Sequence, residues 1–192
     1  MLKDLVRATR SYRSFDSTVE ITREQLAEFV DHARLSASSI NLQMLKFRFV
    51  TEKDECAKVR DSVRWATKVR DIIKLPPEGR EPVAYIVICT DRDVHPSADS
   101  FLIDVGIAAE AIMLAATEAG FGGCMMSSFN KKTFPATLAL PSNLTPHLVL
   151  SLGRPNERVE IAPPAEDGSV TYYREGGIHY VQKRNLEDLI VK

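Results

Sequence analysis

The sequence predicts one packed domain that mixes helices with strands. At 192 residues the chain is long enough for one sizeable core and short of two ordinary domains. Hydrophobic residues make up 44% and charged residues 27%, which excludes the sparse-hydrophobe, high-charge profile of disorder. Helical and strand-like hydrophobic patterns both occur, so we expect residues 1–192 to form a single mixed domain.

Charge, hydropathy and cysteine content exclude several classes of protein. Lys and Arg number 25 against 26 Asp and Glu, so no bulk positive field draws the chain to nucleic acid or anionic lipid. The longest apolar runs, such as residues 83–89, are too short to span a bilayer. Cys56, Cys89 and Cys124 fit neither a disulfide scaffold nor a zinc knuckle. We therefore expect a cytoplasmic protein with no nucleic-acid or membrane partner and no metal.

The first 36 residues predict two amphipathic helices separated by a polar, cationic loop over residues 9–16. Apolar residues recur at helical spacing, at Leu2, Leu5 and Val6 in the first helix and at Leu26, Phe29, Val30 and Ala33 in the second. Thr22 and Gln25 have the spacing of a capping box, which predicts where the second helix begins.

The middle of the chain predicts strands around one long helix. Residues 46–50 alternate, which indicates a strand with one wet face, and residues 83–90 form a continuous β-branched run, typical of a strand buried on both faces. Residues 99–119 form the strongest helix, apolar around nearly its whole circumference, so it must be covered on most sides. Residues 124–126 and 147–152 predict short strands.

The C-terminal segment differs in composition from the rest of the chain. Residues 154–185 are rich in proline and glycine, and only residues 170–173 have strand character. A segment of this length without firm elements is typical of a functional or partner-wrapping arm. Leu186, Leu189 and Ile190 predict a final helical turn.

Common catalytic signatures are absent from the sequence. The four histidines lack HExxH spacing, and neither a G-x-S-x-G elbow nor a phosphate-binding GxxxxGK[ST] loop occurs. The cluster Gly120–Gly123 follows a helix, so it is not a dinucleotide fingerprint. We interpret Cys124 as a small buried hydrophobe and Glu110 as a paired charge on a packed surface. What remains is a set of cations, small polar residues and bare backbone.

Cations near both ends of the chain are candidates for an anion site. Arg10, Ser11 and Arg13 lie in one loop, and Lys183 and Arg184 precede the last turn. If the fold joins them, they supply the groups that a phosphate monoester requires. Solvated surface charge is the simpler alternative for either group alone.

Two further segments have both a functional and a structural interpretation. The segment 38–43, with Ser38, Ser39, Asn41 and Gln43, offers donors and acceptors that can bind the edge of a heterocycle. Alternatively, Ser38, Ser39 or Asn41 caps a helix. Gly120 can end the long helix as a left-handed cap. Three glycines in four positions also suit a backbone that approaches something flat.

Six segments, taken in chain order, resemble motifs of the FMN-dependent nitroreductase family. They are residues 10–16, 38–43, 104–116, 119–124, 152–155 and 183–187. The resemblance implies an α+β fold with a mainly antiparallel central sheet flanked by helices. It also implies an intertwined homodimer with a C-terminal arm that wraps the partner, FMN at the subunit interface, and NADH or NADPH as hydride donor.

The resemblance also implies roles for the cations and the small polar residues. Arg10 and Ser11 match ligands of the FMN phosphate and ribityl chain, and Arg13 lies near the pyrimidine edge of the flavin. Lys183 and Arg184 match C-terminal cations that close on the phosphate. Ser38, Ser39 and Asn41 match a segment that approaches the flavin from the partner subunit, and Gln43 lies beside that segment.

Gly122 and Gly123 match the turn whose backbone approaches the isoalloxazine. The sequence departs from the family at several positions: the family often has a second arginine at Thr9, a glycine at Ile40 and a glutamine at Glu110. These departures bear on the shape and polarity of the substrate pocket.

The implied chemistry belongs to the cofactor and needs no catalytic protein group. Hydride passes from the nicotinamide to flavin N5, and reducing equivalents then pass to a nitroaromatic or quinone-like acceptor. Alternatives are a specialised flavin enzyme of the same fold, of dehalogenase or flavin-fragmenting type, an FMN-binding dimer with little turnover, and a binding module without flavin. The sequence specifies neither the acceptor, nor the choice between NADH and NADPH, nor the pocket residues between 61 and 80.

Overall fold

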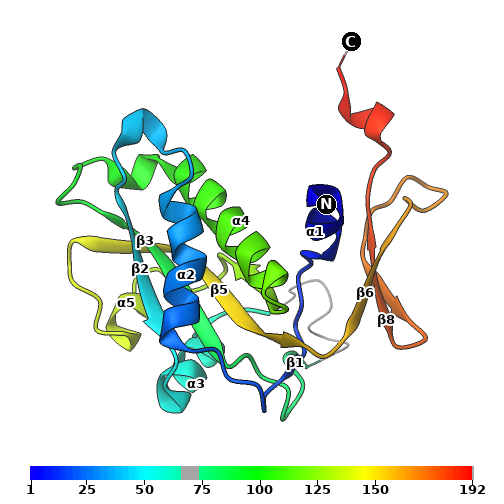
Figure 1. Cartoon of the computed structure of the whole chain (residues 1–192), viewed down its shortest axis with the longest axis horizontal. Helices are drawn as coiled ribbons and strands as arrows, with labels where there is room; N and C mark the ends of the chain where they lie inside the picture. The colour runs from blue at the N-terminus through cyan, green and yellow to red at the C-terminus, as the bar shows by residue number, and fades with distance from the viewer. Residues whose placement is uncertain (66–73, 192) are drawn as a thin grey trace. The chain divides into compact units, whose positions relative to one another are not determined.

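A five-stranded antiparallel sheet organises residues Met1–Pro155 (Figure 1). Its strands are β1 (Phe15–Asp16), β2 (Leu45–Val50), β3 (Ala84–Asp91), β4 (Gly122–Met126) and β5 (Leu144–Pro155). The strand order is β1-β5-β3-β2, and β4 also pairs with β5; every pairing is antiparallel. The mainly antiparallel sheet expected from the sequence is confirmed.

The structure is a computed structural model that describes residues 1–65 and 74–191. Residues 66–73, part of the segment 61–80 in which no pocket residue is predicted, lie outside the described residues. The chain divides into two units, Met1–Pro155 and Asn156–Lys192. The expectation that residues 1–192 form one FMN-binding domain stays a prediction.

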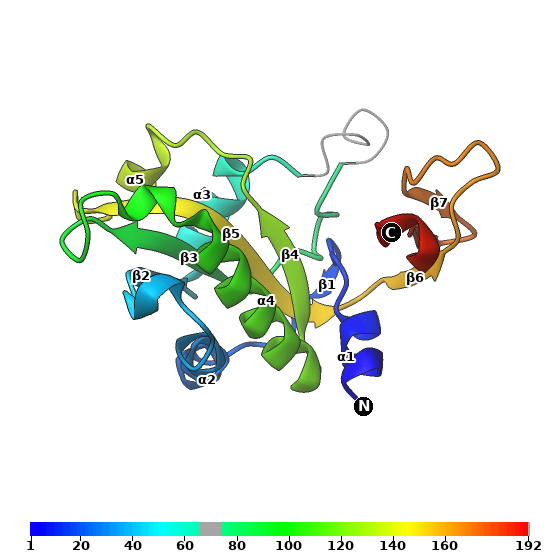
Figure 2. The ribbon, with the colours of Figure 1, turned by 90° about the horizontal axis from the view of Figure 1, so that it is seen from above.

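Helices cover both faces of the sheet. They are α1 (Leu2–Ala8), α2 (Arg23–Arg34), α3 (Lys53–Ser62), α4 (Leu102–Glu118) and α5 (Phe134–Thr137), with short 3₁₀ turns at Ser39–Asn41 and Ala98–Ser100. Figure 2 shows α2 and α4 on one face of the sheet and α3 and α5 on the other. The α+β fold with a helix-flanked sheet is therefore confirmed.

The alternation of side chains along β3 builds two cores. Ile86 and Ile88 point into the core under α2 and α4, while Tyr85, Val87 and Cys89 point into the core under α3 and α5. All eight residues of β3 are buried, as expected for a strand with two covered faces.

The start of α2 is as the sequence predicts. The Gln25 amide donates to Thr22 Oγ1 at 3.2 Å, and the Thr22 amide donates to Gln25 Oε1 at 2.9 Å. This reciprocal pair satisfies two backbone donors that a helix start leaves open. The capping box is therefore confirmed.

The long helix α4 is covered on one side by the described residues. Ala109, Ile112 and Ala116 are fully buried, whereas Ile103 is 77% exposed and Ile107 37% exposed. Because most of the helix is apolar, its exposed side leaves a hydrophobic surface. The covering of that side stays a prediction.

Residues Asn156–Lys192 form a small sheet of their own. Its strands are β6 (Arg158–Ala162), β7 (Tyr173–Glu175) and β8 (Ile178–Gln182), followed by a 3₁₀ turn at Leu186–Leu189. β8 lies between the other two, parallel to β6 and antiparallel to β7. The expectation of strand character only at residues 170–173 is wrong, because these short strands keep many side chains half-exposed and so lack a strong hydrophobic alternation.

Candidate functional site

The fold brings the cationic loop after α1 to the start of β4. The backbone of Ser11 pairs with Gly123 in an isolated parallel bridge. The Tyr12 amide donates to the Gly123 carbonyl at 2.9 Å, and Phe15, at the end of the loop, is fully buried. Two sequence-predicted segments far apart in the chain therefore lie side by side.

The loop carries two arginines that backbone contacts orient. Arg10 Nη2 donates to the Val6 carbonyl at 2.9 Å, and Arg13 Nη1 donates to the Ser11 carbonyl at 3.2 Å. Arg10 Nε is buried and has no hydrogen-bond partner among the described residues, nor does Arg10 form an ion pair with any of them. A half-buried guanidinium without a countercharge, beside the exposed Ser11, suits an anion such as a phosphate monoester.

Each glycine at the end of α4 has a reason within the chain. Gly120 has φ +81°, the left-handed conformation that ends a helix. A Cβ on Gly122 would lie 2.7 Å from the Tyr12 ring, and one on Gly123 would lie 1.8 Å from the Ser151 carbonyl oxygen. The crowding of β4 against β5 and Tyr12 therefore accounts for the glycines, and the approach of Gly122 and Gly123 to a flavin stays a prediction.

The polar loop between α2 and β2 is fastened to the first turn of α4. The Ser39 amide donates to both carboxylate oxygens of Asp104, at 3.1 and 2.9 Å, and the Ser39 hydroxyl donates to one of them at 2.5 Å. Asp104 is only 3% exposed. Because the Ser39 hydroxyl proton is used by Asp104, Ser39 itself has no hydroxyl donor left for a ligand.

Other bonds tie the same loop to itself. The Gln43 amide donates to Ser38 Oγ at 3.0 Å, and Gln43 Nε2 donates to Asn41 Oδ1 at 3.1 Å. Asp104 begins one of the segments that resemble the family, residues 104–116, but its role does not follow from that resemblance. A carboxylate in the first turn of a strongly apolar helix is the signal that could have identified it.

The C-terminal cations lie in the second unit. The Lys183 amide donates to the Ala162 carbonyl at 2.9 Å, and the side chains of Lys183 and Arg184 are exposed. Neither forms an ion pair with the part of the chain that the structure describes. Their convergence with Arg10 on one anion stays a prediction.

A match to a family model agrees with the motifs described above. Residues 6–154 match the model of the nitroreductase family, which is more than half of the chain. The chain belongs to the nitroreductase family. Among curated proteins, it is 24% identical over 178 residues to "Putative NAD(P)H nitroreductase YodC" of Bacillus subtilis (strain 168), covering 79% of this chain and 88% of that one.

Solved structures of the family share the fold. An FMN-dependent nitroreductase from Clostridium difficile R20291 is 23% identical with a TM-score of 0.65, over 81% of this chain and 88% of that chain. A nitroreductase family protein from Streptococcus pneumoniae TIGR4 is 16% identical with a TM-score of 0.71, over 91% of this chain and 100% of that chain. At these identities the likeness shows the fold.

This family member carries an apolar surface beside the Ser39 loop. Its large exposed side chains are Leu35, Ile40, Leu102, Ile103 and Ile107. Glu110 lies exposed on the same helix and forms no ion pair with any described residue, so the expected pairing is not found among them. No helix among residues 1–65 and 74–191 is long and apolar enough to cross a membrane.

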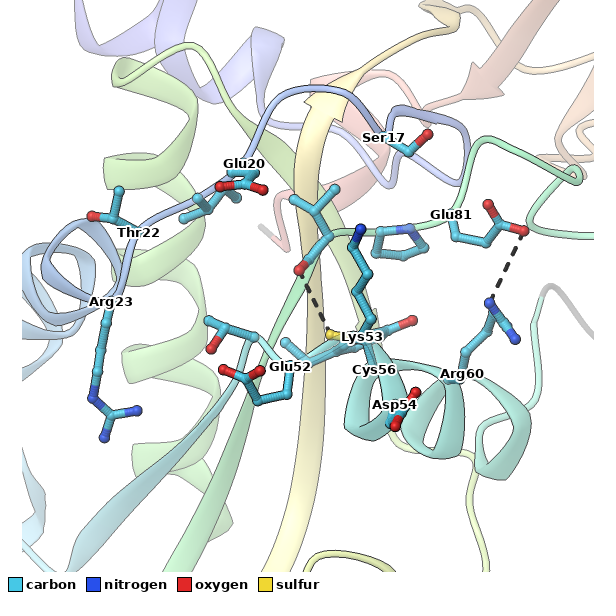
Figure 3. A pocket seen from close by; sticks show the side chains of 16 residues that line it. Ser17, Glu20, Thr22, Arg23, Glu52, Lys53, Asp54, Cys56, Arg60 and Glu81 are labelled. Atoms are coloured by element: carbon cyan, nitrogen blue, oxygen red, sulfur yellow. Dashed lines mark hydrogen bonds and ion pairs between the residues drawn. The ribbon is translucent and has the colours of Figure 1, made fainter.

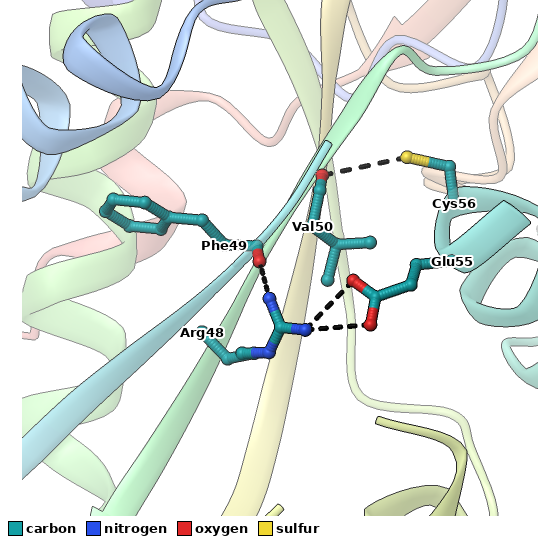
Figure 4. Close-up of polar contacts among 5 residues, drawn as sticks. All are labelled: Arg48, Phe49, Val50, Glu55 and Cys56. Atoms are coloured by element: carbon teal, nitrogen blue, oxygen red, sulfur yellow. Dashed lines mark hydrogen bonds and ion pairs between the residues drawn. The ribbon is translucent and has the colours of Figure 1, made fainter. Parts of the chain in front are cut away.

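Two buried thiols of this family member, those of Cys56 and Cys89, are not activated. Burial raises the pKa of the Cys56 thiol to about 11 and that of Cys89 to about 12. Cys56 Sγ also donates to the Val50 carbonyl at 3.6 Å, beside the pair in which Arg48 Nη2 lies 2.8 and 2.9 Å from the Glu55 carboxylate oxygens (Figure 4). Thiols of this kind stay protonated at neutral pH and are poor nucleophiles. The expectation that Cys124 is buried is confirmed.

A pocket of about 960 Å³ lies between the start of α2, the start of α3 and the beginning of β3 (Figure 3). Acidic and basic side chains share its wall, among them Glu52, Lys53, Arg60 and Glu81. Arg60 Nη1 lies 4.0 Å from a Glu81 oxygen. None of the sequence-predicted ligands lines this pocket, and its mixed charges give no excess that would select an anion.

Proposed function

We propose that this chain is an NAD(P)H-dependent flavin oxidoreductase that binds FMN. The observation that carries the proposal is the Arg10 guanidinium, which lacks a countercharge within the described chain and belongs to the loop whose Ser11 and Tyr12 backbone pairs with Gly123 at the start of β4. Membership of the nitroreductase family supports it, as do the names of its relatives, among them an FMN-dependent nitroreductase and an NAD(P)H nitroreductase.

Different residues of the chain would bind different parts of FMN. Arg10 and Ser11 would bind the phosphate and ribityl chain, and Lys183 and Arg184 would add positive charge at the phosphate. Arg13 would place its charge at the pyrimidine edge of the flavin, a preorganised electrostatic contribution. FMN, when bound, accepts hydride from NADH or NADPH and supplies reducing equivalents to a nitroaromatic or quinone-like acceptor in a ping-pong cycle.

We also infer that two copies of the chain form the working unit. α4 and the loop around Ile40 both carry large exposed apolar side chains, and the Ser39–Asp104 hydrogen bond joins these two segments. A second copy would remove this surface from water, which supplies the main driving force for association. In this dimer, Asn41 and Ser38 would reach the flavin held by the partner subunit.

An absorption spectrum of the purified chain tests the proposal. We expect flavin bands in the purified protein or after addition of FMN, followed by bleaching when NADH or NADPH is added without oxygen. Reoxidation by menadione then supports turnover with a quinone. A colourless protein whose melting temperature ignores FMN would contradict the proposal, because a ligand that binds the native state must stabilise it. A yellow protein that neither nicotinamide reduces would instead indicate a flavin-binding dimer with little turnover.

A further inference from the structure

Asp104 is a buried carboxylate that is hydrogen-bonded to Ser39. Among the described residues, its side chain accepts three hydrogen bonds, all from Ser39, and forms no ion pair. Asp104 lies in the first turn of α4, where the helix dipole favours negative charge. Burial of a carboxylate is unfavourable unless its oxygens are hydrogen-bonded, so Ser39 and Asp104 depend on each other.

The loop that Ser39 begins has a backbone that needs such a fastening. Ile40, Asn41 and Gln43 have φ of +44°, +56° and +51°. The left-handed region is unfavourable for residues with a Cβ and most unfavourable for a β-branched residue such as Ile40. Ile40 is 82% exposed, so burial of its own side chain does not hold this conformation. Hydrogen bonds within the loop support this backbone, and the Ser39–Asp104 hydrogen bonds fasten it to α4.

The fastened loop leaves two polar groups available. Ser38 Oγ accepts from Gln43 and keeps its own O–H, while Asn41 Oδ1 accepts from Gln43 and keeps its NH₂ group. Neither donor has a hydrogen-bond partner among residues 1–65 and 74–191. Both are the type of donor that the carbonyl oxygens and ring nitrogens of a flavin accept.

We propose that Asp104 is a positioning residue for FMN binding. It holds Ser39, and through Ser39 it keeps the strained loop in the one conformation that presents the Ser38 hydroxyl and the Asn41 amide to the flavin. The inference rests on the proposed function, and it adds that affinity for FMN depends on a side chain that is hydrogen-bonded to Ser39 of the loop. Preorganised ligands bind more tightly because the ordering is complete before the ligand arrives.

The test is the Asp104→Asn variant of the full chain, which keeps the shape of the side chain. In either orientation, its NH₂ group faces the Ser39 amide where a carboxylate oxygen now lies at 2.9 or 3.1 Å. We expect the dissociation constant for FMN, measured by quenching of flavin fluorescence, to rise about tenfold, equivalent to about 1.4 kcal/mol. Hydrogen exchange of the Ser39 amide without FMN should accelerate at least as much.

A second substitution separates positioning from general stability. Ile40→Gly relieves the left-handed backbone, so adding it to Asp104→Asn should restore part of the lost affinity. Thr22→Ala is the matched control: it removes the capping box at the opposite end of α2 and should lower the melting temperature by about 2–4 °C, but should leave FMN affinity unchanged.

The outcomes are distinct. An Asp104→Asn variant that binds FMN like the wild type overturns the inference and leaves the proposed function standing. So does an equal loss of affinity in Thr22→Ala, and a double variant that binds no better than Asp104→Asn overturns the strain argument. A wild-type chain that binds no FMN overturns the proposed function itself, and the inference with it.

Discussion

Replacement of Gly123 by alanine is the substitution whose effect the structure defines best. The added Cβ would lie 1.8 Å from the Ser151 carbonyl oxygen, whereas real Cβ atoms essentially never approach closer than 3.0 Å. The two strands must therefore separate by at least about 1.2 Å, because the opposing atom is backbone and cannot rotate away. We expect a loss of roughly 3 kcal/mol, from overpacking and from weakened β4–β5 hydrogen bonds.

Urea denaturation followed by circular dichroism measures this loss, and a scan should show a melting temperature lower by about 6–12 °C. Gly120→Ala is the control, because Gly120 has φ +81° but no atom within 4 Å of its added Cβ. That variant should lose only about 1 kcal/mol. Equal losses in the two variants would refute the reasoning. Because Gly123 also accepts the Tyr12 amide, Gly123→Ala should bind FMN more weakly as well.

Three further predictions address the cofactor, the dimer and the thiols. Arg13→Ala should weaken FMN retention or slow flavin reduction by NADH, measured by stopped-flow absorbance; unchanged affinity and unchanged kinetics would remove the role of Arg13. The Ile103 side chain is 77% exposed and would face the second copy, so Ile103→Asp would bury a charge in the dimer interface. The dimer dissociation constant, measured by light scattering, should rise at least tenfold, while the circular dichroism spectrum stays unchanged. Burial raises the pKa of Cys56 from 9.0 to about 11, so only the unfolded chain loses this proton between these values, and the unfolding free energy should fall as pH rises from about 9 to 11. Cys56→Ala should make that decline shallower, and an identical slope would contradict the assignment.

The parts of the fold that follow local rules could be predicted from the sequence. The Thr22 capping box and the doubly buried strand β3 depend on neighbouring residues and on continuous apolar character. Helix α3 was not predicted, because its ten residues are mostly charged and only Cys56 and Val59 are buried. The small C-terminal sheet was not predicted because β6 pairs with β8, and β7 lies between these two strands in the sequence. Pairing between segments that are not consecutive leaves little signal in the local hydrophobic pattern.

The segments that form the candidate site were predicted from the sequence, but most contacts between these segments were not. The structure brings Ser11 to Gly123, which sequence spacing cannot reveal because the contact joins distant segments. Gly122 and Gly123 are required by close packing against Tyr12 and Ser151, and these two residues are far from the glycines in the sequence. Asp104 was overlooked because its partner Ser39 is 65 residues away.

The ratio of the dissociation constants of riboflavin and FMN tests the central claim most directly, since the two ligands differ only in the phosphate. If the Arg10 guanidinium and its neighbours hold that phosphate, the wild-type chain should bind FMN about 100-fold more tightly, the effect of two charge-assisted hydrogen bonds. Arg10→Ala should remove most of this preference. Equal affinity of the wild-type chain for riboflavin and FMN would contradict the account.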